Sequence, residues 1–450
     1  MVHLIIQKSQ LEGARRLDAE YYQPEYLDWL GHLEKFEPKE LKLLTEKIDV
    51  GFVSSMKNEF RDEGVPLLRT QNVKEFYIDL DADIVYIDEE FHKKLKKSQI
   101  FPGLVLLARS GTIGDACMVP EDFPTANSAD IILIKTKKEL IPEYLTAFLN
   151  SRYGRFQIDR ASSGGLQGHM NLFSLEKLLV PLVKYNLQEE IKKIVQNGLA
   201  GFNDSKSFYS QAENLLLEEL GLKNFEQDGG GLFNVVNLSD VKTAKRCDAE
   251  YFQPKCGRLI SKIRKQNTKL LSDVIENVPA KFNAAAQPDK NFKYVELADI
   301  NASVGTIDGF SEIAGKEAPS RAKRVLKPGD VIVSSVEGSL GKVALVDKEQ
   351  EGYLASTGFF QFRSKEILPE VLLVLARSLI FQMQLEKMCA GTILTAVPKE
   401  AVNNVVVPIL PKPTQQKIAD LVRASHSARK KAKGLLEEAK KKVEEMIDKK

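Results

Sequence analysis

Two long stretches of the chain place apolar or small residues at alternating steps of four and three. The first covers residues 187–222, and the second covers 414–446, 227 positions further on. This spacing is typical of long helices that bury one narrow stripe. The stripes comprise Leu187, Ile191, Ile194, Gly198, Gly201, Ser205, Phe208, Ala212, Leu215, the charged exception Glu219 and Leu222, and then Thr414, Ile418, Leu421, Ser425, Ala428, Ala432, Leu435, Ala439, Lys442 and Met446.

Small residues occupy the middle of both stripes. Gly198, Gly201 and Ser205 in the first stretch correspond to Ser425, Ala428 and Ala432 in the second. Facing small residues let two helices approach closely. We therefore infer that the two helices pack on each other. The alternative, in which each helix packs only on its own globular domain, stays open at this stage.

Shorter periodic segments precede each long helix in the same order. Each copy has roughly 130 residues of short predicted strands with Gly, Pro and Asn between them, then a Leu- or Val-rich helix (143–156 and 370–387), then a strand ending in VPL or VPI. RLDAEYYQPEY at 16–26 matches RCDAEYFQPKC at 246–256 in seven of eleven positions. The chain is therefore predicted to be an internal repeat of two α/β (α+β) domains related by a pseudo-twofold axis.

The repeat suggests four parts, which we place at residues 1–184, 185–225, 226–411 and 412–450. A length of 450 residues exceeds what one hydrophobic core serves. The apolar runs are too short for membrane spans, and the opening residues lack the apolar centre of a secretory signal. We expect a chain without membrane association in the cytoplasm.

Catalytic and metal-binding motifs are missing from the sequence. The four cysteines form no Cys-x-x-Cys pair, and the five histidines show no His-Glu-x-x-His spacing. GSLGKV at 338–343 lacks the glycine spacing of a phosphate-binding loop. The net charge of +2 gives no global reason to expect nucleic acid, so only local charge bears on that question.

The polar residues of the loops differ between the two copies. A shared scaffold with divergent Arg, Asn, Gln, Ser and Thr side chains suits the reading of base edges, where Arg pairs with guanine and Asn or Gln with adenine. Ordinary solvated loops are the alternative. The candidate DNA contacts are Ser54, Ser55, Lys57, Asn58, Arg69, Gln71, Asn72, Arg109, Ser110, Thr112, Asn127, Ser128, Ser163, Gln167 and His169 in copy one, and Lys281, Asn283, Ser335, Ser339, Lys342, Ser356, Thr357 and Thr392 in copy two.

Three basic clusters are candidates for phosphate contacts that position a duplex. They are His92 to Lys97, the group Arg152, Arg155 and Arg160, and the group Arg321, Lys323, Arg324 and Lys327. Each of them also fits a solvated face of the protein.

Several segments resemble the specificity subunit of type I restriction-modification systems. They are VPILPKPTQQKI at 407–418, LQEEIKKI at 187–194, GVPLLRTQNV at 64–73 and PGLVLLARSGTIG at 102–114. The corresponding NFKYVELADI at 291–300 departs from the pattern, as does VPLVKYNLQEEI at 180–191, which lacks two of the prolines.

The resemblance implies a non-catalytic subunit that reads double-stranded DNA. Each domain would be a target-recognition domain for one half of a split site, and the long helices would form an antiparallel coiled coil that sets the gap. Two adenine methyltransferase subunits would dock on the helices, and motor or endonuclease subunits would join for cleavage. This chain would bind no cofactor; S-adenosylmethionine, ATP and Mg would belong to the partners.

Two other functions remain alternatives from the sequence alone. One is a self-sufficient enzyme that modifies nucleic acid, and the other is a duplicated protein-interaction scaffold. The repeated Asp-Ala-Glu-Tyr segments are expected to be common framework, or a subunit contact, because their identity argues against a role in choosing between unlike half-sites.

Overall fold

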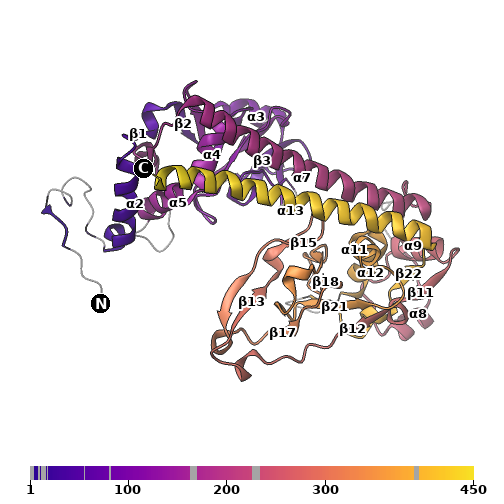
Figure 1. Cartoon of the computed structure of the whole chain (residues 1–450). Coiled ribbons are helices and arrows are strands. Elements are labelled where there is room, and N and C mark those ends of the chain that lie inside the picture. The colour runs from indigo at the N-terminus through magenta and orange to yellow at the C-terminus, as the bar shows by residue number, and fades with distance from the viewer. Residues whose placement is uncertain are drawn as a thin grey trace. The chain divides into compact units, whose positions relative to one another are not determined.

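The computed structural model describes residues 5–8, 11, 17, 19–54, 56–80, 83–162, 170–225, 234–389 and 395–449. It divides into two compact units (Figure 1). Unit 1 comprises Met1–Phe202 with Lys430–Lys450, and unit 2 comprises Asn203–Arg429. The division runs through both long helices, so each unit holds one α/β domain together with a segment of each helix. We refer to the α/β parts, residues 19–184 and 234–411, as domain 1 and domain 2.

Domain 1 contains two four-stranded sheets. The first has the order β2 (Thr45–Val50), β9 (Ile131–Thr136), β6 (Val105–Ala108) and β7 (Ala116–Met118), all antiparallel. The second has the order β4 (Val85–Ile87), β3 (Val65–Leu68), β8 (Ala126–Ser128) and β5 (Gln99–Ile100). Its inner strands β3 and β8 run parallel, so their carboxyl ends meet at the same edge.

Domain 2 repeats this strand order in both sheets. The first sheet has the order β12 (Ile275–Asn277), β21 (Phe359–Ser364), β18 (Asp330–Ser334) and β19 (Val343–Leu345). The second has the order β16 (Ser311–Ala314), β13 (Asn291–Val295), β20 (Leu354–Ser356) and β17 (Ala322–Val325), with β13 and β20 parallel. The predicted internal repeat of α/β domains is confirmed.

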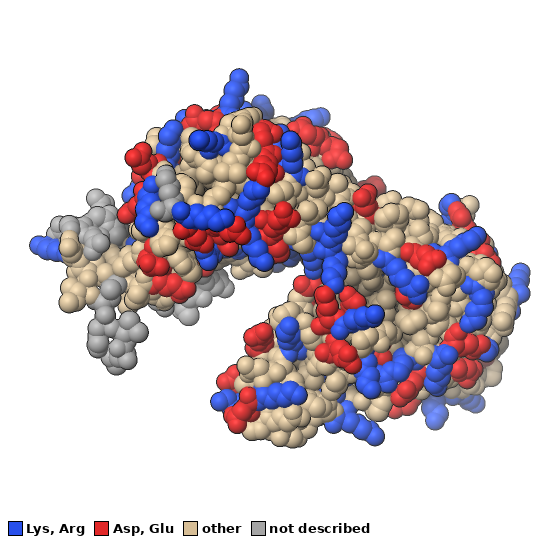
Figure 2. Space-filling view, viewed as in Figure 1, with Lys and Arg blue, Asp and Glu red and all other residues tan. Residues whose placement is uncertain are grey.

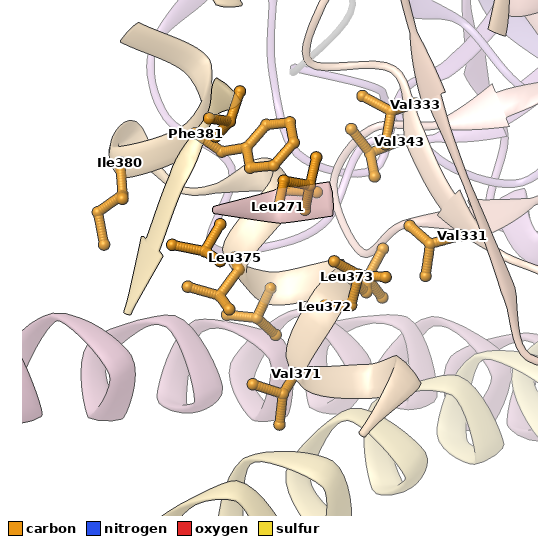
Figure 3. Packing of buried hydrophobic residues seen from close by; sticks show 14 of the residues in the cluster. Leu271, Val331, Val333, Val343, Val371, Leu372, Leu373, Leu375, Ile380 and Phe381 are labelled. Atoms are coloured by element: carbon orange, nitrogen blue, oxygen red, sulfur yellow. The ribbon is translucent and has the colours of Figure 1, made fainter. Parts of the chain in front are cut away.

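Both faces of the first sheet are covered in each domain. In domain 1, Val105 and Ile132 pack with α4 (Pro142–Asn150) and α5 (Arg152–Ser162), whereas Leu106 and Leu133 pack with the second sheet. Burial on both sides explains why these strands read as continuous apolar runs. Figure 3 shows the corresponding cluster of domain 2, where Val331, Val333 and Val343 gather with leucines of α11 (Pro369–Arg377).

The single helices expected at 143–156 and 370–387 are each two helices. α4 ends before α5 at Ser151, and α11 ends before α12 (Leu379–Met388) at Ser378. Both serines are extended, and their hydroxyl groups donate to the carbonyls of Phe148 and Leu375, at 2.6 and 2.7 Å. This local hydrogen bond competes with helix continuation, which hydrophobic periodicity does not reveal.

Short elements complete each domain. Two small antiparallel pairs stand at equivalent places, β1 (Lys39–Glu40) with β10 (Leu179–Val180) and β11 (Thr268–Leu270) with β22 (Val406–Pro408). The others are α2 (Pro24–Glu34), α3 (Glu89–Lys94), α6 (Leu172–Glu176), α8 (Leu238–Ala244), α9 (Pro254–Ile263), α10 (Leu271–Val274), β14 (Ile300–Asn301) and β15 (Thr306–Ile307).

The long helices are α7 (Tyr185–Glu219) and α13 (Lys412–Asp448). In unit 1, Gly198 contacts Leu436 while Glu190 pairs with Lys442, so the two helices run antiparallel. In unit 2, the hydroxyl groups of Ser205 and Ser425 lie 3.1 Å apart. The prediction that the two helices pack on each other is therefore confirmed within each unit.

The buried stripe of each helix is only half as predicted. Ile191, Gly198, Ser205, Ala212 and, just beyond α7, Leu222 are buried, as are Ile418, Ser425, Ala432 and Ala439, whereas the charged exception Glu219 is exposed. The other predicted members are only half-buried, and in each case the buried residue is the next one along the chain. These half-buried members are Leu187, Ile194, Gly201, Phe208 and Leu215 in α7, and Thr414, Leu421, Ala428, Leu435, Lys442 and Met446 in α13. The buried residues there are Gln188, Val195, Phe202, Tyr209 and Leu216, and Gln415, Val422, Arg429, Leu436 and Val443. Each helix also packs on a domain, which widens the stripe beyond a coiled-coil seam.

Buried glutamines attach both helices to their domains in the same way. Gln188 Oε1 accepts from Ile141 N at 2.8 Å, and its Nε2 donates to Val183 O at 3.1 Å. Gln415, 227 positions later, accepts from Leu368 N at 3.2 Å and donates to Leu410 O at 2.9 Å. Because both amide groups bond to backbone that would otherwise be buried unpaired, they fix where each helix begins.

Candidate nucleic-acid interface

The loops that follow β3, β6 and β8 meet at one edge of domain 1. Asp130 accepts hydrogen bonds from Arg109 Nη1 at 3.3 Å and from Ser110 Oγ at 2.9 Å. Ser110 Oγ also lies 3.4 Å from Thr70 Oγ1, in the loop after β3. The structure thus brings together candidate residues from three predicted loops.

Arg69 and Gln71 share one carboxylate at this edge. Arg69 Nη2 donates to Asp83 Oδ2 at 2.9 Å and also to the backbone carbonyl of Asp83, and Gln71 Nε2 donates to Oδ2 at 3.2 Å. These hydrogen bonds lower the pKa of the Asp83 carboxyl group, and the one from Arg69 has the larger effect. The Asp83 side chain is 81% exposed and the Arg69 side chain 29% exposed, so the pair holds a partly buried guanidinium at this edge.

Asn72 supports the turn that presents Arg69. It is fully buried, and its Oδ1 accepts from Arg69 N at 2.8 Å while its Nδ2 donates to Asp79 O at 2.9 Å. In domain 2, Asp299 takes the same place and accepts from Glu296 N at 2.8 Å. In this arrangement the polar atoms of Asn72 bond within the protein, and the residue positions its neighbours.

Asn127 and Ser128 are buried in the second sheet of domain 1. Asn127 Nδ2 lies 3.2 Å from His92 Nδ1, and Ser128 Oγ donates to Ser98 O at 2.9 Å. Both side chains therefore tie β8 to the lysine-rich segment 92–98. They stay predictions as DNA contacts, with their polar groups directed inward here.

Four of the other candidates of domain 1 are exposed, namely Ser54, Lys57, Asn58 and Thr112. Arg109, besides its contact with Asp130, donates from Nε to Met170 O at 2.9 Å. Ser55, Ser163, Gln167, His169 and, from domain 2, Thr392 lie outside the described residues.

Domain 2 carries a different set of side chains on the same loops. Glu296 stands where domain 1 has Arg69, and it pairs with Arg321 at 3.1 Å. Arg321 O in turn accepts from Thr357 N at 2.8 Å. The sequence placed Arg321 in a basic cluster but did not predict that it lies at this edge. Its partners Glu296 and Thr357 are distant from it in the sequence, so no local pattern reveals the contact.

The remaining candidates of domain 2 are distributed between its surface and its interior. Ser335 Oγ donates to Gly358 O at 2.9 Å, Ser339 Oγ to Val336 O at 3.0 Å, and Lys342 Nζ to Ile300 O at 3.0 Å. Ser356 is buried, whereas Lys281 and Asn283 are exposed.

Sequence reasoning missed the acidic partners of the candidate arginines. Asp83 and Asp130 both hold an arginine at this edge, but neither follows a pattern that distinguishes it from other loop carboxylates. Asp130 has a left-handed backbone with φ of 55°, which only the structure reveals.

Several members of the basic clusters are half-buried or buried. Arg155 pairs with Asp115 at 2.6 Å, and the guanidinium of Arg160 lies 3.8 Å from the Tyr21 ring centroid. Arg324 is 4% exposed, and burial lowers its pKa to about 10. On the face seen in Figure 2, cationic and anionic side chains are interspersed on both units. Neither unit therefore shows a surface of cationic side chains alone on that face.

A surface cavity of about 450 Å³ adds a further polar feature to domain 1. Lys96 and Lys97 line it beside Phe101 and Leu133, and Lys135 at its wall pairs with Glu46 at 2.6 Å. Within the described ranges, no group of three or more His, Cys, Asp or Glu side chains is placed to hold a metal ion. None of the described helices combines the length and apolar character of a transmembrane span.

Comparison with known proteins decides the family. A family model described as the type I restriction modification DNA specificity domain matches residues 33–206 and again 249–438, which together exceed half of the chain. The chain belongs to this family. Each match covers one α/β domain and extends into the long helix that follows it.

Individual relatives of this specificity-domain family match in part. The type I restriction enzyme HindI specificity subunit of Haemophilus influenzae is 28% identical over 158 residues, which is 34% of this chain and 33% of that protein. The chain thus matches only about a third of the length of this curated relative.

Solved structures of specificity subunits also match. The HsdS subunit of Thermoanaerobacter tengcongensis is 32% identical over 34% of this chain and 40% of that one, with a TM-score of 0.31. The type I restriction-modification S subunit of M. genitalium is 12% identical, covers 90% of this chain and 95% of that one, and has a TM-score of 0.42.

Proposed function

We propose that this chain is the DNA sequence-specificity subunit of a type I restriction-modification complex. Each domain reads one half of a bipartite site, and the long helices set the distance between the halves. The observation that carries this proposal is the repeated domain with unlike loops: one turn, held by Asn72 or Asp299, offers Arg69 in domain 1 and Glu296 in domain 2. Unlike side chains on like scaffolds suit two unlike half-sites.

The chemistry is proposed to belong to partner subunits. Two adenine methyltransferase subunits dock on this chain, and motor or endonuclease subunits join for cleavage. S-adenosylmethionine, ATP and Mg act on those partners, and this chain is non-catalytic. The family match supports this division, since its description is that of a DNA specificity domain.

Domain exchange tests the proposal. The chain is co-expressed with its methyltransferase, residues 50–180 are replaced by the corresponding segment of another family member, and modified adenines are mapped in the host genome. One half of the modified sequence is expected to change while the other half is kept. If both halves stay the same, the proposal is wrong.

Two measurements exclude the other functions. The purified chain alone is expected neither to bind S-adenosylmethionine nor to cut DNA, whereas a self-sufficient enzyme does at least one of these. The assembled complex is expected to bind DNA with an affinity that falls steeply as salt rises, because phosphate contacts release counterions. A protein-interaction scaffold shows no such binding.

A further inference from the structure

Each domain rests on segments of both long helices. We call residues 185–202 with 430–448 seat 1, on which domain 1 packs, and residues 203–219 with 412–429 seat 2, on which domain 2 packs. The repeat offset of 227 residues relates positions of one seat to positions of the other. The packing is alike, but the charges at one pair of equivalent positions are opposite.

Seat 1 presents a cation to domain 1. Lys440 Nζ lies 3.1 Å from Glu75 Oε2, and the lysine side chain is only 15% exposed. The other oxygen of Glu75 accepts from Arg155 Nη2 at 2.9 Å, and the same nitrogen contacts Asp115 at 2.6 Å. Glu75 is thus bridged between a cation of its own domain and a cation of the helix.

Seat 2 presents an anion at the equivalent position. Glu213 corresponds to Lys440, and Ala302 corresponds to Glu75. Burial raises the pKa of Glu213, and the charge of Arg377 opposes this rise. Domain 2 therefore brings a cation to the helix where domain 1 brings a carboxylate.

Arg377 is held at this contact by domain 2 and by the helix together. Its guanidinium lies 4.1 Å from the ring centroid of Tyr209 on α7, and its Nη2 donates to Ser303 O at 3.1 Å. Its Nη1 is buried without a hydrogen-bond partner in the described structure. Glu213 lies one helical turn from Tyr209 on α7 and is the anion whose charge attracts this half-satisfied buried cation.

We infer that Lys440 and Glu213 are positioning residues that match the charge of each seat to its own domain, so that neither domain fits the other seat equally well. Domain 2 placed on seat 1 would bring Arg377 against Lys440. Domain 1 placed on seat 2 would bring Glu75 against Glu213. Like charges in a partly buried contact repel strongly, so the wrong pairing is disfavoured in addition to the right one being favoured.

The test uses a full-length chain that carries domain 2 on both seats. Residues 39–180 are replaced by a second copy of 266–407, and hydrogen exchange is followed at the amides of 430–448. In the native chain, Lys440→Glu is expected to lower protection by about tenfold, a size common for coupled contacting residues. In the two-copy chain, the same substitution is expected to raise protection by about tenfold, because it removes the repulsion from the second Arg377.

If Lys440→Glu changes the hydrogen-exchange protection in opposite directions in the two chains, the effect depends on the charge of the domain and not on a merely structural role of Lys440. Lys441→Glu is the matched control, because Lys441 is the exposed neighbour of Lys440 on the same helix. It is expected to change protection by less than about twofold in either chain. An effect of Lys440→Glu with the same sign in both chains overturns the inference, as does an equal effect of Lys441→Glu.

A second measurement applies if the two-copy chain does not fold. In the native chain, Lys440→Gln and Glu75→Gln are combined in a double-mutant cycle with the same exchange readout. The two substitutions together are expected to lower protection less than the product of their single effects. Independent effects overturn the inference. Neither measurement involves DNA, so the inference about Lys440 and Glu213 can fail or hold independently of the proposed DNA-reading function.

Discussion

The residue after β3 shows how one backbone turn carries unlike chemistry. Arg69 and Glu296 occupy equivalent positions, and in both domains the side chain three residues on, the buried Asn72 or the half-buried Asp299, accepts from their backbone nitrogen at 2.8 Å. Because Asn72 or Asp299 holds the backbone of the turn, the side chain at the position of Arg69 and Glu296 can differ in charge without altering the turn. The residue that we propose to read DNA and the residue that shapes the loop are thus separate.

Replacing Arg69 tests the reading role. Arg69→Ala is expected to relax selection at one base pair in one half of the modified sequence, because a bidentate arginine contact discriminates by about 1–3 kcal/mol. The measurement is genome-wide mapping of modified adenines. Arg61→Ala is the matched control, since Arg61 is an exposed arginine of the same domain that pairs with Asp88 at 3.0 Å. An unchanged sequence with Arg69→Ala contradicts the assignment.

Replacing Asn72 tests the shaping role. Asn72→Ala leaves the backbone groups of Arg69 and Asp79 without their partner, and is expected to lower the free energy of unfolding by about 1–3 kcal/mol in urea titration. The control is Asn58→Ala at an exposed position, which is expected to change it by less than about 0.5 kcal/mol. Equal effects of the two substitutions would show that Asn72 has no supporting role.

His426 makes the attachment of domain 2 depend on pH. Its Nε2 donates to Val304 O at 2.8 Å. Burial, together with the nearby Arg377 and Arg429, lowers its pKa from the ordinary 6.5, and this is opposed by the hydrogen bond to Val304 O and by the charge of Asp347. The unfolded chain therefore binds a proton more readily than the folded one. Stability from this group is complete above about pH 6.5 and is lost as the pH falls below it.

We therefore expect the unfolding midpoint of the full chain to fall on acidification below about pH 6.5. In His426→Gln, which keeps a donor but does not titrate, part of this fall should disappear. Thermal unfolding at a series of pH values measures it. His32→Gln, on α2, should retain the wild-type fall, and a wild-type fall in His426→Gln would refute the assignment.

At the scale of elements, the sequence predicted the long helices and their contact but placed half of the buried positions one residue early. Ile194 and Phe208 stand next to Val195 and Tyr209, so hydrophobicity alone does not decide which of two apolar neighbours is innermost. Gln188 and Arg429 are polar but buried, so hydrophobicity predicts the wrong environment for them. Their burial depends on hydrogen bonds and an ion pair, which the spacing of apolar residues does not reveal. The strand order of each domain likewise depends on pairings distant in sequence.

Close approach of the helices in unit 1 depends on Gly198. A Cβ there would lie 2.8 Å from Leu436 Cδ2 and 2.9 Å from its Cγ. Gly198→Leu is expected to lower the free energy of unfolding by about 1–3 kcal/mol, because extra carbons force the packed helices apart. Urea titration of the full chain measures this change.

Gly434 on α13 gives the matched control, since no atom lies within 4 Å of its Cβ position. Gly434→Leu is expected to raise the free energy of unfolding by up to about 1 kcal/mol through better helix propensity. Stabilisation by both substitutions would mean that the helices do not approach at Gly198.

At the scale of the whole molecule, the repeat in the sequence was sufficient to predict two similar domains joined by two long helices. Most candidate loops do lie at shared strand ends, because Gly, Pro and polar residues mark where strands stop. Which of their side chains face inward was not predictable: Asn72, Asn127 and Ser128 read as surface residues and are buried. Their partners, such as Ser98 and Asp79, come from other loops.

The proposed spacing role of the helices predicts the effect of lengthening them. Seven residues inserted after Phe202 and seven after Arg429 keep the 3.5-residue repeat and add about 10.5 Å to each helix. The unread gap in the modified sequence is expected to widen by about three base pairs at roughly 3.4 Å each. Mapping of modified adenines measures the gap. Substitution of seven residues without insertion is the control, and an unaltered gap in the lengthened chain contradicts the role.

Two further glutamines have a consequence for how such chains diversify. Gln157 accepts from Leu179 N at 2.8 Å and donates to Leu179 O at 3.1 Å, and Gln384 does the same with Val406 at 2.8 and 2.9 Å. Each side-chain amide thus joins a helix to both backbone groups of one strand residue, in β10 or in β22, without involving any residue of the candidate loops. Substitutions in the loops that we propose to read DNA would therefore leave these attachments of helix to strand intact, so a change of selectivity would need no compensating mutation there.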